Sequence, residues 1–408
     1  MMSVTGDSAR PLPMSTLLLV VFIDFVGIGA LIPILPYTVI DELGYSETVM
    51  TALLACFSLA MFIGNPLLGR LSDKIGRKPV LMGSLAVATI AHFAFAFSEH
   101  ILLMFISRII AGLAAGNIGV IQALIADNTA PEERARFMGL LGASIGAGFV
   151  FGPALGGLLS GLGGGPLHQA PFAIAGTFTI IAFLLCLRLP HLPVIDSDDD
   201  KEVPISATAR LVQLVRGPLG LFALAFFLLN LSFSQVEAAF VLFLKDAFAY
   251  RASDTGWIFT YVGICIIIVE GGLIGRAVKK FGEIGVIIGG ASLLTAGQFI
   301  TALTGAGLIF AHILPLAVVL LCTTMICVGY GFTNPSLSSA SSKAARRDEM
   351  GGALGLVQGF GSLGQVVGLA MAGPLYAAGS APLSFGTGGF ISLAMLVVII
   401  YIGRRTTS

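Results

Sequence analysis

Twelve apolar stretches recur from one end of this 408-residue chain to the other. A helix needs about 20 apolar residues to cross the hydrocarbon core of a bilayer, and each stretch is roughly that long or longer. The stretches lie near residues 15–40, 48–69, 79–98, 101–126, 136–161, 170–189, 217–244, 255–275, 284–304, 307–334, 351–378 and 383–403. Only 11% of the residues are charged, whereas a soluble domain carries about 25%. The pattern therefore predicts an all-α membrane protein with twelve transmembrane helices.

Basic residues are distributed unevenly between the loops that join these stretches. If the N-terminus is cytoplasmic, 19 of the 22 lysines and arginines lie on the cytoplasmic side, and only Lys245 and Arg251 lie outside. Membrane proteins concentrate Lys and Arg in cytoplasmic loops, so we expect both termini to be cytoplasmic. The formal net charge is zero, which argues against a nucleic-acid partner.

The chain reads as two related halves. Its longest hydrophilic stretch follows the sixth span, which predicts an N-terminal six-helix bundle (1–189), a cytoplasmic linker (190–216) and a C-terminal six-helix bundle (217–408). "GRLSDKIGR" (69–77) is similar to "GRAVKKFGE" (275–283), and "GFVFGPALGG" (148–157) to "GQVVGLAMAG" (364–373). Internal repeats of this kind are typical of secondary transporters, which bind substrate near the midplane between the halves.

The loop between spans 2 and 3 is the most specific motif. We expect its glycines to allow a tight turn and close helix approach. Asp73 stands among basic residues, where it can accept charge-assisted hydrogen bonds from an arginine or a helix N-terminus. A loop that merely fixes topology is the alternative. The predicted gating residues are Gly69, Asp73, Gly76, Arg77, Lys78, Asp127 and Arg134.

"GRLSDKIGRKPVL" (69–81) resembles the hallmark loop of the major facilitator superfamily. The resemblance implies that family's fold, twelve transmembrane helices in two pseudo-symmetric six-helix bundles. It also implies that Asp73 and Arg77 latch the cytoplasmic ends of the two halves in the outward-facing state. In the second-half copy, Lys279 replaces Asp73 and Glu283 replaces Arg77.

Span 5 carries a glycine-rich face with small-xxx-small spacing, which permits close helix packing, and a proline that can kink the helix. "GAGFVFGPALGGLL" resembles the signature that marks antiporters within the superfamily, which implies that span 5 packs against span 8 of the other half. General glycine packing explains the same residues without a direction of transport. The motif residues are Gly148, Gly152, Pro153, Gly156 and Gly157.

Three ionisable residues inside spans are candidates for proton coupling: Asp24, Arg108 and Glu237. A charge at the centre of a membrane helix costs roughly 2.5–3.5 kcal/mol on insertion scales, so such residues are functional by default. "DFVGIGALIPILP" (24–36) and "SRIIAG" (107–112) are similar to the first and fourth spans of drug:proton antiporters of the tetracycline-exporter branch. The resemblance implies that Arg108 tunes protonation of a nearby carboxylate. Arg108 snorkelling outward and Glu237 acting as a structural acid are the alternatives.

The chain departs from that branch in spans 3, 8 and 9. The exporters carry an additional acid in span 3, where this chain reads "ATIAHFAFAF" with Ala91 and His92. Span 8 supplies Glu270 but no histidine, and span 9 has no acid. His92 is either a pH-sensitive group or a packed polar residue, and Glu270 is expected to reach the cytoplasmic interface. A central cavity is expected to contain Phe25, Phe57, Asn117, Gln122, Asn230, Phe233, Gln235, Asn334 and Gln358. Hydrogen bonding between helices is an equally good explanation of the polar ones.

Together these features predict a proton-coupled multidrug or tetracycline-like efflux antiporter that works by rocker-switch alternating access. The alternative is an exporter of a sugar, siderophore or other metabolite on the same scaffold. The partners of the predicted drug antiporter would be a lipophilic small molecule, protons and membrane lipid. We expect this protein to be a monomer in a bacterial inner membrane. The sequence has no nucleophile elbow, phosphate-binding loop or zinc-type histidine spacing, so we expect no enzyme activity, metal or cofactor.

Overall fold

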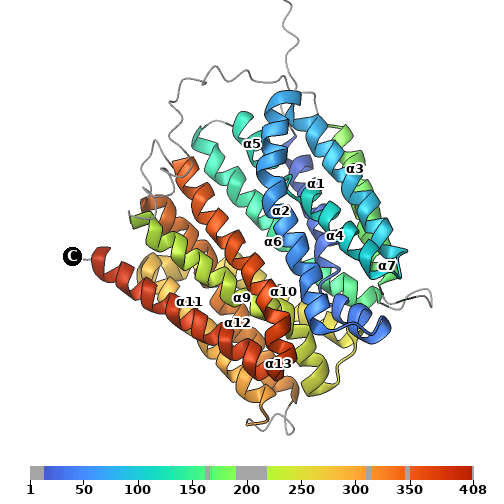
Figure 1. Ribbon diagram of the computed structural model, residues 1–408. Helices are drawn as coiled ribbons and strands as arrows, with labels where there is room; N and C mark the ends of the chain where they lie inside the picture. Colours follow the sequence, from blue (N-terminus) through green and yellow to red (C-terminus); the bar gives the residue numbers. More distant parts are fainter. Residues whose placement is uncertain are drawn as a thin grey trace, which may run out of the picture.

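The computed structural model describes residues 13–129, 131–160, 166, 168–189, 218–308, 315–344 and 350–406. The predicted linker (190–216) lies outside these residues. The described part of the chain is helical and contains no strand. Helices of the first half lie on one side of the molecule and helices of the second half on the other, as the colours of Figure 1 show.

Every long helix coincides with an apolar stretch of the sequence, because the backbone N–H and C=O groups of a segment in hydrocarbon must be paired within that segment. The first half comprises α1 (Met14–Gly29), the π-helix η1 (Tyr37–Glu42), α2 (Glu47–Ile75), α3 (Arg77–Ala96), α4 (Ile101–Ala115), α5 (Ile118–Asp127), α6 (Pro131–Leu159) and α7 (Gln169–Leu187). The second comprises α9 (Pro218–Phe248), α10 (Ala252–Ile268), the π-helix η2 (Val269–Leu273), α11 (Ile274–Gly305), α12 (Pro315–Ala344) and α13 (Met350–Thr406).

Two of the longest helical segments are hairpins rather than single spans. Among the described residues, nine helical segments are long and apolar enough to cross a membrane. The segment 252–305 breaks at Gly282, where φ is 71°, and α13 breaks at Gly379 and Ser380. Counting each broken segment as two and adding the shorter apolar helix α1 gives the twelve crossings expected from the sequence.

We call the end of the bundle that holds Met14, Gly76 and Asp127 the N-terminal face, and the opposite end, which holds residues 43–46 and 249–251, the far face. Within the first half, α1 packs against α6 and α7, and α2 and α3 pack against α4. Within the second, α9 and α11 pack against α13, and α11 packs against α12. Two helices of each half also pack against helices of the other half: α2 packs against α13, and α6 packs against α10.

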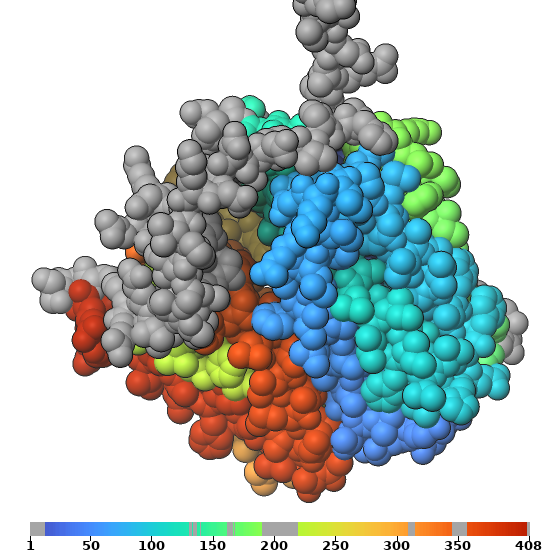
Figure 2. Space-filling view, turned by 45° about the horizontal axis from the view of Figure 1, so that its top comes forward, coloured from blue at the N-terminus to red at the C-terminus, as the bar shows by residue number. Residues whose placement is uncertain are grey.

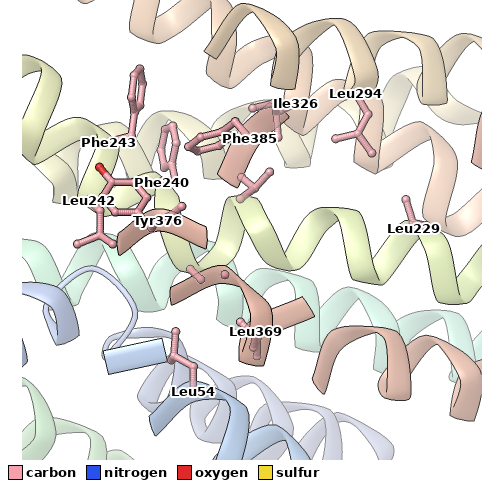
Figure 3. Close-up of a cluster of buried hydrophobic side chains, with 14 of the residues drawn as sticks. Leu54, Leu229, Phe240, Leu242, Phe243, Leu294, Ile326, Leu369, Tyr376 and Phe385 are labelled. Carbon is pink, nitrogen blue, oxygen red and sulfur yellow. The ribbon is translucent and has the colours of Figure 1, made fainter. Parts of the chain in front are cut away.

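The contact of α2 with α13 is visible in Figure 2, where the blue helix of the first half adjoins the orange helix of the second. The largest cluster of buried apolar side chains lies mainly in the second half and extends over this boundary. Figure 3 shows Leu54 of α2 near Leu369 of α13, while Phe240, Phe243 and Phe385 form another part of the same cluster. Apolar burial therefore joins the two halves as well as each bundle.

Candidate functional site

Asp24 is a buried residue of α1, the helix that packs against α6 and α7 in the first half. Ten residues separate it from the first residue of α1, so at 1.5 Å per residue it stands about 15 Å along the helix. Its side chain is only 6% exposed, and its Oδ1 atom has no hydrogen-bond partner among the described residues. The Thr179 hydroxyl of α7 is its polar neighbour. A nearly isolated carboxyl group at this depth is costly unless it is used.

Arg108 lies in α4 and is equally buried, with 3% of its surface exposed. Its guanidinium stands over the Phe57 ring of α2, with the Cζ atom 4.2 Å from the ring centroid, a cation–π contact. Nε and Nη1 have no hydrogen-bond partner among the described residues. No ion pair of the described residues joins Arg108 to Asp24. The arginine therefore points inward, and it does not snorkel to the surface.

Glu237 of α9 belongs to a separate polar group in the second half. Its Oε2 accepts a hydrogen bond from Gln365 Nε2 of α13 at 3.1 Å. One helical turn earlier, the Phe233 ring stacks on Tyr330 of α12, with centroids 3.9 Å apart. Glu237 is thus hydrogen-bonded between α9 and α13, as the structural alternative expects, and its role in proton coupling stays a prediction.

Glu270 occupies η2, the π-helix that interrupts span 8. Single π-helical turns inside α-helices occur frequently at functional sites. The Glu270 carboxylate faces α6 of the other half, where its Oε2 lies 3.8 Å from the place of a Cβ atom on Gly146. The residue therefore faces the boundary between the halves, a position that the sequence reading did not assign to it.

The predicted cavity residues are spread over several environments. Two of them, Asn117 and Gln235, are fully buried between helices: Asn117 donates to Ser84 at 3.0 Å, and Gln235 donates to Gly368 O at 2.9 Å. These contacts agree with the alternative that the two side chains form hydrogen bonds between helices.

The remaining cavity residues differ in exposure and in partners. Asn230 donates to the Phe226 carbonyl of its own helix at 2.9 Å. Phe25 is buried and packs edge to face on Phe149 of α6, with centroids 5.4 Å apart. Phe233 and Asn334 are half-buried, whereas Gln122 and Gln358 are exposed.

The hallmark loop forms a polar cluster at the N-terminal face. Gly76 joins α2 to α3 at φ 98°, a conformation that favours glycine. Arg77 pairs with Asp73, donates to Ser72 Oγ at 2.7 Å and reaches Asp127 of α5 at 3.1 Å. All of these partners belong to the first half, so no contact of Arg77 seen here joins the two bundles.

Two other residues of the predicted gate, Gly69 and Lys78, are placed differently from the expectation. Gly69 lies inside α2 with nothing within 4 Å of a Cβ position, so it serves neither a turn nor a close approach. Lys78 is buried and donates to the carbonyls of Leu187, at 2.9 Å, and Leu189, so it fastens α3 to the end of α7. The side chain of Arg134 lies outside the described residues.

The second half repeats this cluster with the charges exchanged. Glu283, which corresponds to Arg77, accepts a hydrogen bond from Lys343 Nζ at the end of α12, at 2.8 Å, and another from Ser339. Lys343 ends span 10 as Asp127 ends span 4. Each half therefore has its own ion pair between the start of one span and the end of another at the N-terminal face.

The antiporter motif has two partners. Cβ atoms on Gly148 and Gly152 would collide with α1, and one on Gly156 would collide with Ala30 directly after α1. These glycines therefore allow close packing of α6 against the helix that carries Asp24. Gly157 instead contacts Gly256 of α10, in the other half. The implied packing of span 5 on span 8 is therefore present, but only part of the motif takes part in it.

The far face holds contacts between the halves that the sequence reading missed. Tyr37 of η1 donates to Tyr250 O and bonds the Thr255 hydroxyl, both at 2.9 Å. Asp41, one turn further, pairs with Lys245 of α9. They border a cavity of about 560 Å³ that Ser160, Arg251 and Ser253 also line. The only sequence feature that pointed to this face was the pair of basic residues, Lys245 and Arg251, in predicted loops of the side that otherwise lacks Lys and Arg.

The sequence model of the family described as "Major Facilitator Superfamily" matches residues 17–355. The chain belongs to the major facilitator superfamily. This superfamily member is therefore a membrane transporter and not an enzyme. Its twelve crossings and two bundles are the fold that the resemblance implied.

Relatives of this superfamily member extend over nearly its whole length. Multidrug resistance protein 1 of Bacillus subtilis (strain 168) is 30% identical over 371 residues, which cover 90% of each chain. Tetracycline resistance protein, class C, of Escherichia coli is 30% identical over 393 residues, 94% of each chain.

Solved structures agree with the fold. The human organic anion transporter MFSD10 (TETRAN) matches with a TM-score of 0.69 and 21% identity over 95% of this chain and 98% of that one. A D-xylose-proton symporter matches with a TM-score of 0.74 and 17% identity over 94% and 95%. At these identities the likeness concerns the arrangement of helices alone.

Proposed function

We propose that this transporter is a drug efflux antiporter that exports multidrug-type or tetracycline-like compounds in exchange for protons. Relatives named for multidrug and tetracycline resistance, each covering at least 90% of the chain, support the substrate class. The resemblance of the span-5 glycine motif to the antiporter signature supports antiport, and two glycines of that motif, Gly148 and Gly152, pack against α1, which carries Asp24.

One observation carries the proton coupling: Asp24 is buried at mid-helix depth and one of its carboxylate oxygens has no partner among the described residues. A low-dielectric site disfavours the charged form of a carboxylate, whereas water or a nearby cation favours it. Asp24 can therefore bind a proton in one conformation and release it in another, provided that the access of water changes between them. Arg108, buried in the same half, is the cation that we assign to this balance.

The contacts between the halves suggest how access changes. Tyr37, Asp41 and Gly157 join the halves at the far face, while the ion pairs of Arg77 and Glu283 at the N-terminal face stay within one half each. We assign this arrangement to the state that opens at the N-terminal face. The excess of Lys and Arg in the loops at that face supports a cytoplasmic location, so this state would take up substrate from inside the cell. Rocking of the bundles would then break the far-face contacts and release the substrate outside.

For the substrate we assign the region around the Phe233–Tyr330 stack, with Glu237 and Asn334 as its polar members. Flat aromatic surfaces beside a carboxylate suit compounds that are lipophilic and carry a polar or charged group. We further propose that the protein works as a monomer in a bacterial plasma membrane, with both termini in the cytoplasm.

A liposome assay tests the proposal. Purified protein is reconstituted, a pH gradient is imposed, and uptake of lipophilic cations and tetracyclines is followed for the wild type, Asp24→Asn and the exposed-acid control Glu99→Gln. We expect gradient-driven movement in the wild type and the control and a loss of at least tenfold in Asp24→Asn. Unchanged gradient-driven movement in Asp24→Asn would contradict the coupling role. Movement of sugars or other metabolites but of no drug would support the alternative substrate class instead.

A further inference from the structure

Polar atoms without partners gather in the interior of the first half. Asp24 Oδ1, His92 Nε2 and the Nε and Nη1 atoms of Arg108 all lack a hydrogen-bond partner among the described residues. These three side chains are 6%, 2% and 3% exposed and come from α1, α3 and α4. Buried polar groups are nearly always paired, so these exceptions call for an explanation.

The Thr179 hydroxyl of α7 connects two of these groups. Its Oγ1 lies 3.3 Å from His92 Nδ1, donates to the Ala175 carbonyl at 3.0 Å, and is also the polar neighbour of Asp24. A hydroxyl group has one proton to donate and two lone pairs with which to accept. Ala175 O, His92 Nδ1 and the Asp24 carboxylate therefore compete for one donor.

We propose that His92 is a positioning residue for the proton-coupling acid: through Thr179, it sets the pH at which Asp24 takes up and releases its proton. This inference rests on the proposed function and deepens it, since it concerns the same site. Neither His92 nor Thr179 needs to exchange protons with Asp24, because the hydrogen-bond direction alone carries the effect.

The direction follows from the tautomer of His92. When Nδ1 carries the ring proton, the imidazole donates to Thr179 Oγ1, and only the Ala175 carbonyl competes with the Asp24 carboxylate for the threonine proton. When Nδ1 is bare, it competes for the threonine proton and Asp24 loses its donor. A hydrogen bond to the charged form of an acid stabilises that form, so the two arrangements hold the Asp24 proton with different strength.

Other titratable groups surround this chain of hydrogen bonds. α4 contributes Arg108, which acts electrostatically on His92, and α2 contributes Cys56, which is within electrostatic range of Arg108. The Arg108 side chain rests on Phe57 of α2. The Thr179 variants leave these groups unchanged, so they separate the effect of the hydroxyl from that of the surrounding charges.

The experiment measures the pH dependence of gradient-driven drug uptake in liposomes for the wild type, Thr179→Val, Thr179→Ser, His92→Phe and the double variant Thr179→Val/His92→Phe. Valine removes the hydroxyl at nearly constant volume, and serine keeps it. We expect the midpoint of the pH profile to move by about one unit toward higher pH in Thr179→Val, which corresponds to ~1.4 kcal/mol, and to stay in place in Thr179→Ser. His92→Phe is expected to move the midpoint too, but to have no further effect when Thr179→Val is already present.

Substrate exchange without a gradient, measured on the same samples, shows that each variant is folded and binds drug. Unmoved profiles in Thr179→Val and His92→Phe, with exchange intact, would overturn the inference, as would additive shifts in the double variant. If the wild type itself shows no gradient-driven uptake, the proposed function fails, which is a different outcome from a wild type that transports with an insensitive profile. Should His92→Phe fail to fold, Thr179→Val with its serine control still decides the question.

Discussion

Gly157 of α6 and Gly256 of α10 lie backbone against backbone across the boundary between the two halves, near the far face. A Cβ atom on Gly157 would meet Gly256 Cα and would lie 2.8 Å from the Ala252 carbonyl oxygen. Backbone atoms cannot move aside as a flexible side chain can. The close approach of the halves at this point therefore depends on the missing side chain.

Substitution of this glycine should weaken the closed far face. We expect Gly157→Ala to reduce gradient-driven transport at least tenfold, because α6 and α10 must separate to admit one methyl group. The matched control is Gly83→Ala, since Gly83 is exposed in α3 and has nothing within 4 Å of its Cβ position. Equal transport rates of Gly157→Ala and the control would show that the two helices tolerate a wider spacing.

Tyr37→Phe should loosen the same face by removing two hydrogen bonds between the halves. Each such bond contributes about 0.5–1.5 kcal/mol, so the loss of both, about 1–3 kcal/mol, should make opening roughly five- to 150-fold more frequent. The readout is the labelling rate of a thiol introduced at Ser160, which lines the far-face cavity, by a membrane-impermeant maleimide. Asp41→Asn is the comparison: its ion pair is partly exposed, with Lys245 25% and Asp41 41% accessible, and should contribute less than about 1 kcal/mol. A larger effect of Asp41→Asn than of Tyr37→Phe would reverse this ranking.

Arg108→Lys should impair transport even though it keeps the positive charge. The planar guanidinium covers the Phe57 ring at 4.2 Å, and the compact ammonium of lysine cannot reproduce that contact together with the same reach. We expect a loss of tenfold or more in gradient-driven uptake, with a similar loss in Phe57→Leu. Wild-type rates in Arg108→Lys would mean that only the charge matters.

The exchanged ion pair of the second half permits a charge-swap test. Lys343→Glu places two carboxylates together, and Glu283→Lys in the same chain restores an opposite pair with the order found in the first half. Because Lys343 is 71% exposed, the single variant should change stability by no more than about 1 kcal/mol. Transport should fall in the single variant and recover in the double one. No recovery would show that Ser339 or another neighbour requires a carboxylate at position 283.

The number and order of the spans follow from the sequence alone, for a physical reason. Hydrocarbon offers no partners to backbone N–H and C=O groups, so an apolar stretch of sufficient length must become a helix whatever its neighbours are. The break at Gly282 and the turn at Gly76 could be anticipated in the same way, because each is a glycine between an apolar stretch and a basic loop. Asp24 and Arg108 could be selected because a charge inside a span is costly.

Tertiary structure decided which side chains meet. Gly148, Gly152 and Gly156 follow each other at intervals of four and face α1, while Gly157 is turned toward the other half, and only the packing distinguishes these roles. Tyr37 and Tyr250 are separated by 213 residues, so no local pattern connects them. His92 and Thr179 likewise come together through the packing of α3 on α7. Helix formation in a membrane is a local requirement of each segment, whereas the partners of a polar side chain are set by the contacts between helices that are distant in sequence.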